Sequence, residues 1–83
     1  MSKKIVIYTK DHCPYCDRAK HLLTSLSLEF EVVNAEIKNN FVEMLSKSNG
    51  MRTVPQIFIG EKHIGGFEQL NQMNKNNELQ NYL

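Results

Sequence analysis

Two cysteines, Cys13 and Cys16, are the residues of this chain best suited to chemistry. They are its only cysteines and lie three positions apart. A disulfide between them closes almost no loop, so it removes little entropy from the unfolded chain. Small secreted domains instead use several disulfides that close long loops. The pair is therefore expected to serve thiol–disulfide exchange or metal binding rather than structural support.

The sequence argues against metal binding. A structural zinc site needs four ligands, and besides the two thiols the chain offers only the imidazoles of His12, His21 and His63. His12 is adjacent to Cys13, and His63 falls in a segment with the pattern of a strand. We therefore expect no metal.

The residues around the cysteines predict a strand followed by a helix. Residues 5 to 8 form a continuous apolar run, which is typical of a strand covered on both faces. Pro14 suits the first position of a helix, where no backbone donor is required. Apolar residues then recur at helical spacing: Tyr15, Ala19, Leu22, Leu23 and Leu26. This pattern places Cys13 where the helix begins.

A helix start can activate a cysteine. Only the thiolate attacks a disulfide, and a free cysteine has a pKa of about 8.5. The unpaired amides of the first turn, those of Tyr15 and Cys16, point toward the Cys13 sulfur and favour its anion. Lys10 adds a positive charge nearby, and the spacing brings Cys16 beneath Cys13, where it can attack a mixed disulfide. We expect Cys13 to be the nucleophile and Cys16 the resolving thiol.

Length and composition set the remaining bounds. The 83 residues suffice for a single domain, residues 1–83, and a hydrophobic fraction of 41% is ordinary for a folded protein. A net charge of +1 gives no indication of nucleic acid or membrane as a partner. The N-terminal residues lead into an apolar run of only four residues. Since this is short for a signal peptide, we expect no export and a cytoplasmic location.

The remaining strands define the fold class. Residues 30 to 32 alternate as an edge strand does, and residues 56–59 and 62–64 read as two strands joined by a Gly60-Glu61 turn. With the helices, the order is strand, helix, strand, helix, strand, strand, helix. This order predicts an α/β protein with a four-stranded mixed sheet, three helices and helices on both faces.

The boundaries of the second and third helices are read from capping patterns. Asn40 followed by Glu43 resembles an N-cap whose helix carries, three residues later, a side chain that bonds back to the N-cap amide. Gly50 can end that helix in a left-handed conformation. A last helix begins at Phe67. We expect it to fray before the end of the chain, because residues 71 to 81 hold five asparagines.

The segment Thr53-Val54-Pro55 precedes a predicted strand. Proline cannot donate to a sheet, so it belongs at the first position of the strand. A cis Val54–Pro55 bond would let the Val54 backbone pair with an incoming peptide as an added strand does. A trans bond is the commoner arrangement for such a residue pair.

Two further features can bind anions. The residues Gly65-Gly66-Phe67-Glu68 form a loop that turns into a helix, and its amides suit an anion, although a flexible hairpin exit is an equal explanation. Arg52 can hold a carboxylate by two parallel hydrogen bonds.

Together these residues resemble the glutaredoxin family over essentially the whole chain. The matching motifs are Tyr8-Thr9-Lys10, Cys13-Pro14-Tyr15-Cys16, Thr53-Val54-Pro55 and Ile64-Gly65-Gly66. The resemblance implies a thioredoxin fold, glutathione as the reducing co-substrate and a cis Val54–Pro55 bond. It also implies that Cys13 forms the mixed disulfide with glutathione and that Cys16 resolves it.

The resemblance further implies three groups of glutathione contacts. Those around the glycine carboxylate are Lys10, Tyr15 and Arg52. Those along the cysteinyl backbone are Thr53 and Val54, beside Pro55. Those at the γ-glutamyl end are Gly66, Phe67 and Glu68.

The sequence departs from the family pattern at the γ-glutamyl end. The family commonly has an aspartate or serine and then an aspartate after the two glycines, whereas this chain has Glu68 and Gln69. Phe67 is also bulkier than the small residue often found there. We expect glutathione to bind with altered affinity.

Two alternatives compete with a glutathione-disulfide oxidoreductase. One is a binding module that shares an iron–sulfur cluster across a dimer, with thiolates as ligands; Pro14 and Cys16 count against it, because such relatives usually lack one or the other. The second is a donor served by a flavin reductase, against which Lys10, Tyr15 and Arg52 argue together.

The expected enzyme is a monomer that acts on glutathione and on proteins with disulfides or glutathionylated cysteines. A ribonucleotide reductase is a client at the level of the family only. The sequence names no particular client.

Overall fold

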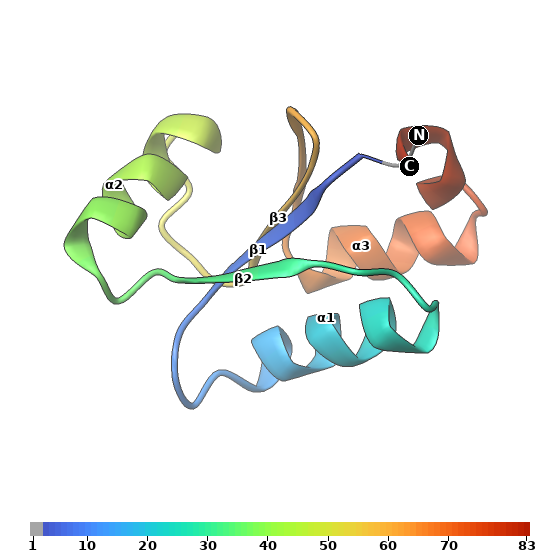
Figure 1. Cartoon of the computed structure of the whole chain (residues 1–83), viewed down its shortest axis with the longest axis horizontal. Coiled ribbons are helices and arrows are strands. Elements are labelled where there is room, and N and C mark those ends of the chain that lie inside the picture. Colours follow the sequence, from blue (N-terminus) through green and yellow to red (C-terminus); the bar gives the residue numbers. More distant parts are fainter. Residues whose placement is uncertain (1–2) are drawn as a thin grey trace.

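A computed structural model describes residues 3–83, which form a four-stranded mixed sheet with three α-helices (Figure 1). The elements are β1 (Ile5–Thr9), α1 (Pro14–Ser25), β2 (Glu31–Asn34), α2 (Lys38–Lys47), β3 (Gln56–Ile59), β4 (Lys62–Gly65), α3 (Phe67–Lys75) and the 3-10 helix η1 (Leu79–Tyr82). The strand order is β2-β1-β3-β4. β1 runs parallel to β2 and antiparallel to β3, and β3 pairs antiparallel with β4. The predicted fold class is confirmed.

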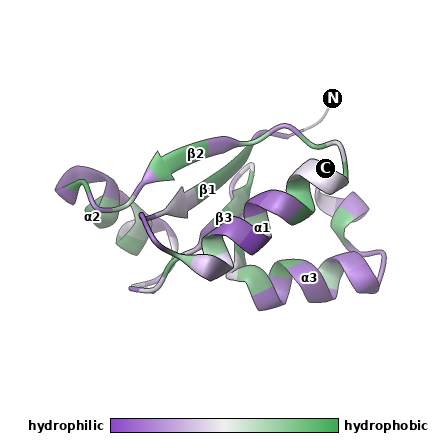
Figure 2. Ribbon diagram, turned by 90° about the horizontal axis from the view of Figure 1, so that it is seen from below, coloured by the Kyte–Doolittle hydropathy of each residue, from purple (hydrophilic) through white to green (hydrophobic). Residues whose placement is uncertain are grey.

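The helices cover both faces of the sheet, as predicted (Figure 1). On one face, Ile5 and Ile7 of β1 pack with Leu23 of α1 and Leu70 of α3 in one cluster of buried side chains. On the other face, a smaller cluster joins the sheet to α2, and its members are Tyr8, Ala35, Met44 and Phe58. Successive residues of a strand point to opposite faces, which is why β1 serves both clusters. In Figure 2, α3 shows hydrophobic residues on its side toward α1 and hydrophilic residues on its outer side.

The start of α2 differs from the prediction. The helix begins at Lys38, two residues before Asn40. Its N-cap is Ile37, and no side chain caps it. The turn after β2 fixes this start, because the Asn34 side chain accepts a hydrogen bond from the Glu36 amide. Asn40 therefore lies inside the helix and donates to the Asn34 carbonyl oxygen at 3.0 Å. Its predicted role as N-cap is wrong.

The end of α2 is a left-handed turn of two residues. Asn49 and Gly50 have φ angles of 58° and 87°, and the Gly50 amide donates to the Leu45 carbonyl at 2.8 Å. This is the bond that closes a helix when the residue after the C-cap is left-handed. Gly50 thus adopts the expected conformation, but Asn49 makes the first left-handed step.

The last helix, α3, ends at Lys75, before the end of the chain as expected, but the segment after it is not frayed. Asn77, with φ of 58°, turns the chain after α3, and the Glu78 amide donates to the Met73 carbonyl at 2.8 Å. The chain continues into η1, which buries Leu79 in the cluster beneath α1 and α3. Burial of Leu79 stabilises an end that helix propensity alone would leave loose. Among residues 3–83, no helix has the length and apolar character that a membrane span requires.

Candidate active site

Cys13 is the N-cap of α1, as the sequence predicted. Its backbone is extended (φ −115°, ψ 100°), and its Sγ accepts a hydrogen bond from the Cys16 amide at 3.2 Å. The sequence predicted donors at both Tyr15 and Cys16. Among the described residues, only the Cys16 amide donates to this sulfur. This geometry directs a backbone donor at the sulfur where negative charge develops during exchange.

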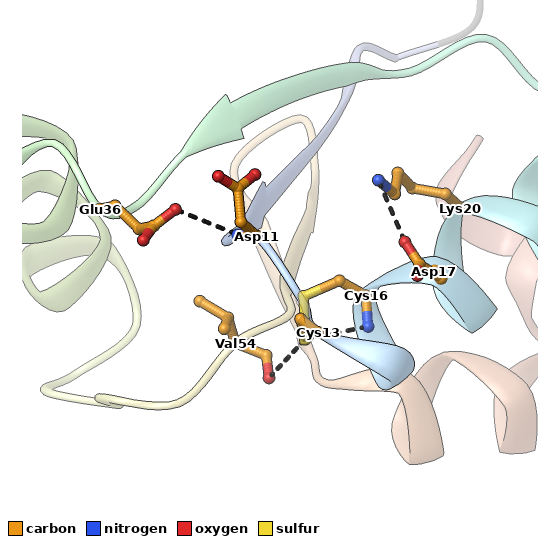
Figure 3. A network of polar contacts seen from close by, with 7 residues as sticks. All are labelled: Asp11, Cys13, Cys16, Asp17, Lys20, Glu36 and Val54. Carbon is orange, nitrogen blue, oxygen red and sulfur yellow. Dashed lines mark hydrogen bonds and ion pairs between the residues drawn. A yellow bond between two sulfur atoms is a disulfide. The ribbon is translucent and has the colours of Figure 1, made fainter.

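The two cysteines are joined as a disulfide, with their Cα atoms 5.2 Å apart (Figure 3). Cys13 retains an exposed fraction of 7%, whereas Cys16 is fully buried. An incoming thiol therefore reaches the Cys13 sulfur first, because the Cys16 sulfur lies beneath it. The order of the two thiols stays a prediction, which this difference in exposure supports.

The Thr53-Val54-Pro55 segment faces the cysteines. The Val54–Pro55 peptide bond is cis, as the family resemblance implied. The Val54 carbonyl oxygen lies 3.9 Å from Cys13 Sγ, and Figure 3 shows it directed at the disulfide. A peptide backbone held beside Val54 therefore lies within reach of the reactive sulfur.

A hollow of about 250 Å³ collects most of the predicted glutathione residues. Its walls come from the start of α1, the cis-proline segment and the start of α3. The residues that line it are Tyr15, Thr53, Val54, Pro55, Gly66, Phe67, Glu68 and Gln69. Residues from three separate parts of the chain thus meet on one side of the Cys13 sulfur.

A second hollow, of about 340 Å³, adjoins the first at Thr53 and Val54 and contains the predicted cations. Its lining residues are Lys10, Ala35, Glu36, Phe41, Arg52, Thr53 and Val54. The Arg52 guanidinium carbon lies 5.9 Å from the centre of the Phe41 ring. Two cations beside the cis-proline segment suit a carboxylate, as the resemblance implied.

Tyr15 lines the first hollow and lies beside Phe67, which lines it too. Its side chain is 51% exposed, and its ring centre lies 6.2 Å from that of Phe67. The Arg18 guanidinium carbon lies 5.1 Å from the Tyr15 ring centre. This arrangement places Phe67 as a bulky wall where the family often has a small residue.

Two side chains at the site, those of Glu36 and Gln69, have roles that the sequence analysis did not predict. The Glu36 carboxylate accepts a hydrogen bond from the Asp11 amide at 3.1 Å and holds the loop that leads to Cys13 (Figure 3). Gln69 accepts a hydrogen bond from the Gly66 amide at 2.9 Å and caps α3. A sequence signal for Glu36 did exist, because it follows β2, and the carboxyl ends of parallel β1 and β2 meet at one edge of the sheet.

Across residues 3–83, the structure gathers no cluster of three or more His, Cys, Asp or Glu side chains suited to a metal ion. A cysteine pair at the start of a helix, opposite a cis-proline segment on a mixed four-stranded sheet, defines a thiol–disulfide oxidoreductase of the thioredoxin fold.

Comparison with known proteins narrows this class. The family model described as Glutaredoxin matches residues 5–64. The chain is 40% identical over 75 residues to a glutaredoxin of Pseudomonas aeruginosa, covering 90% of this chain and 89% of the relative. It is 46% identical over 66 residues to glutaredoxin 3 of Escherichia coli, covering 80% of each.

Solved structures agree with these sequence comparisons. A buckwheat glutaredoxin–glutathione complex superposes with a TM-score of 0.84 at 28% identity, over 98% of this chain and 76% of the other. The chain belongs to the glutaredoxin family. The predicted activity, that of a glutathione-disulfide oxidoreductase, is confirmed at the level of this family.

Proposed function

We propose that Cys13 carries the exchange and that Cys16 completes it. The Cys13 thiolate attacks one sulfur of a substrate disulfide, and the other sulfur leaves as a thiolate. With a glutathionylated substrate, the products are Cys13 bound to glutathione and the free substrate thiol. A second glutathione thiolate then attacks the glutathione sulfur, releases oxidised glutathione and restores the Cys13 thiolate.

A protein disulfide takes a route through both cysteines. Attack by Cys13 leaves the substrate joined to it by a mixed disulfide, and the Cys16 thiolate then displaces the second substrate thiol. The resulting Cys13–Cys16 disulfide is the form that the structure describes. Two glutathione molecules reduce it and leave as oxidised glutathione.

The observation that carries this proposal is the hydrogen bond from the Cys16 amide to Cys13 Sγ, with the Val54 carbonyl oxygen 3.9 Å from the same sulfur. The bond supports negative charge on Cys13 rather than on Cys16. The backbone at Thr53 and Val54 supports pairing with the cysteinyl part of glutathione, which would align its sulfur with Cys13.

The two hollows support one orientation of glutathione. Lys10 and Arg52 line the second hollow, which would take the glycine carboxylate, while Gly66, Phe67 and Glu68 line the first, which would take the γ-glutamyl end. Tyr15, which the resemblance assigned to the glycine carboxylate, lines the first hollow. The first turn of α3 presents amides to the γ-glutamyl carboxylate. The Gly66 amide is already bonded to Gln69, so the amides that follow it are the ones left for the ligand.

Cysteine variants test the two roles separately. Glutathione-coupled reduction of a small glutathione mixed disulfide should be abolished in Cys13→Ser and retained in Cys16→Ser, because that route needs one thiol only. Reduction of a protein disulfide should be impaired in both variants. Equal loss of the first activity in the two variants would show that the roles are assigned wrongly.

The proposed substrates are protein disulfides and glutathionylated cysteines, and the proposed state is a monomer in the cytoplasm. Support for this location comes from the cysteine usage, in which both thiols serve the site and neither joins distant parts of the chain. Sedimentation of the reduced protein and fractionation of cells test state and location. A ribonucleotide reductase is one client to assay directly.

A further inference from the structure

Gln56 is a buried polar residue directly behind the cis-proline segment. It is the first residue of β3 and has an exposed fraction of only 1%. Its Nε2 donates to the Thr53 carbonyl oxygen at 3.0 Å and to Thr53 Oγ1 at 3.2 Å. Its Oε1 lies 2.6 Å from His63 Nε2 in β4. The amide thus links the outer strand of the sheet to the segment beside Cys13.

The hydrogen-bond partners determine which way the Gln56 amide points. The Thr53 carbonyl only accepts, so the amide nitrogen must face Thr53 and the amide oxygen must face His63. His63 Nε2 must then carry a proton and donate it to Gln56. Burial, and secondarily the charge of Lys62, lower the pKa of His63 below its ordinary value, which favours the neutral ring. The contact with Gln56 then requires the proton of that ring on Nε2.

The His63 ring is itself held in place. Its centre lies 4.9 Å from that of Phe58, and the two rings stack at 29°. Phe58 is buried in the cluster beneath α2. The donor to Gln56 therefore belongs to a packed part of the sheet rather than to a free surface side chain.

The segment that Gln56 contacts is held by side chains: Val54 packs against the cluster beneath α2, and Pro55 is buried. Residues 52–55 lie in no helix or strand, and the backbone hydrogen bonds of turns and loops in the described chain do not include them. Yet this segment carries the Val54 carbonyl that lies 3.9 Å from Cys13 Sγ, and Thr53 and Val54 line both hollows. Its distance from Cys13 depends on side-chain contacts.

We propose that Gln56 is a positioning residue for glutathione exchange, which holds the Thr53–Val54 backbone beside Cys13, and that His63 acts through Gln56 by fixing its amide. This inference rests on the proposed pairing of glutathione with Thr53 and Val54. Neither side chain touches the reacting sulfurs. Their effect is on the binding of the glutathione part of the substrate and not on the nucleophile.

Two substitutions remove the two halves of this link. Gln56→Met keeps the length of the side chain and removes its hydrogen bonds. His63→Phe keeps a ring against Phe58 and removes the donor to Gln56. Gln72→Met is the matched control, because Gln72 is exposed on α3.

In Gln56→Met, the KM for a small glutathione mixed disulfide should rise about tenfold, the effect of losing hydrogen bonds in a buried site. The kcat should stay within about twofold, and so should the rate at which iodoacetamide alkylates reduced Cys13. His63→Phe should raise the KM less, about threefold. The double variant should match Gln56→Met, because His63 acts only through Gln56. Gln72→Met should match the wild type.

An unchanged KM in Gln56→Met would overturn the proposal, as would an equal fall in kcat and in Cys13 alkylation. If Gln56→Met does not fold, His63→Phe carries the test, together with the nitrogen NMR spectrum of His63 in the wild type. A ring protonated on Nδ1 alone would overturn the role of His63. The glutathione-dependent activity of the wild type is measured separately. Its absence would contradict the proposed function rather than the role of Gln56.

Discussion

The phenol of Tyr8, in the centre of the sheet, donates a hydrogen bond to the carboxylate of Glu43 on α2. Tyr8 is fully buried, and Lys47 forms an ion pair with the same carboxylate at 3.6 Å. Burial and, secondarily, the bond to Glu43 raise the pKa of Tyr8 above its ordinary value of 10.0. Glu43, which the sequence pattern assigned to capping its own helix, thus ties α2 to the sheet instead.

Removal of the Tyr8 hydroxyl should lower the free energy of unfolding without disturbing the packing of the ring. In Tyr8→Phe the ring keeps its edge contact with Phe58, whose centre lies 5.6 Å away. The urea concentration at half-unfolding should fall, because α2 loses its hydrogen bond to β1. Tyr82→Phe is the control, since Tyr82 lies at the chain end against Lys62. Equal midpoints in the two variants would contradict a stabilising role for the bond.

The same pair predicts a pH dependence. The hydrogen bond from Tyr8 and then the charge of Lys47 lower the pKa of Glu43 below its ordinary value of 4.5. The stability that this provides is fully present above pH 4.5 and is lost as the pH falls through the lower pKa of the folded state. Urea unfolding at stepped pH should show a smaller acid-side loss in Tyr8→Phe than in the wild type. Superimposable profiles would exclude this linkage.

Gly65 and Gly66 should differ in their tolerance of a methyl group. Gly65 has φ of 118°, and an added Cβ would lie 3.1 Å from the side chain of Gln69. Gly65→Ala should therefore cost about 1–3 kcal/mol of unfolding free energy. Gly66→Ala meets its nearest atom at 3.4 Å with ordinary backbone angles and should cost less. Thermal unfolding of both variants checks the order, and the reverse order would refute the argument.

Glu36 should weaken glutathione binding by its charge. It lines the same hollow as Lys10 and Arg52, so its carboxylate opposes a carboxylate of the ligand. Glu36→Gln keeps an acceptor for the Asp11 amide and removes the charge, and it should lower the KM for glutathione about two- to fivefold. The effect should shrink at about 0.5 M salt, which screens exposed charges. A higher KM in this variant would count against the proposed orientation of glutathione.

Glu68→Asp tests the departure from the family pattern. An aspartate keeps the charge in the first turn of α3 and restores the residue type that the resemblance expects there. The KM for glutathione should stay nearly unchanged or fall, because the backbone amides of the turn are retained. Glu78→Asp, outside the hollows, serves as control. A large rise in KM would show that the γ-glutamyl end is misassigned.

Local patterns were sufficient for the elements that carry the cysteines. The apolar run before the pair, Pro14 after Cys13 and the helical spacing of Ala19 and Leu23 each involve residues near in sequence. The conformation of Cys13 as N-cap follows from those neighbours, since a helix start is defined over a few residues. The cis Val54–Pro55 bond was different, because only the family resemblance implied it.

Sequence patterns gave wrong predictions where a side chain forms its contact with a residue distant in the sequence instead of with its own helix. Asn40 and Glu43 have the spacing of a capping pair, yet Asn34 and Tyr8 bind them instead. The asparagine-rich end was expected to fray, but the core beneath α1 and α3 accepts Leu79. Helix propensity and capping are worth about 1 kcal/mol each, so one buried contact from elsewhere in the fold outweighs them.

The sequence by itself predicted the cysteine pair, the proposed order of its two thiols and the class of fold, because each prediction rests on residues that are close neighbours or on periodicity. The tertiary structure alone decided which side chains support the site. Glu36 reaches the loop before Cys13 only because β1 and β2 pair in the sheet. Gln56 is close in sequence to Thr53, but the partner that fixes its amide, His63, lies on β4. A hydrogen bond between residues far apart in the chain produces no regular spacing that a sequence pattern could reveal, so its partners become evident only in three dimensions.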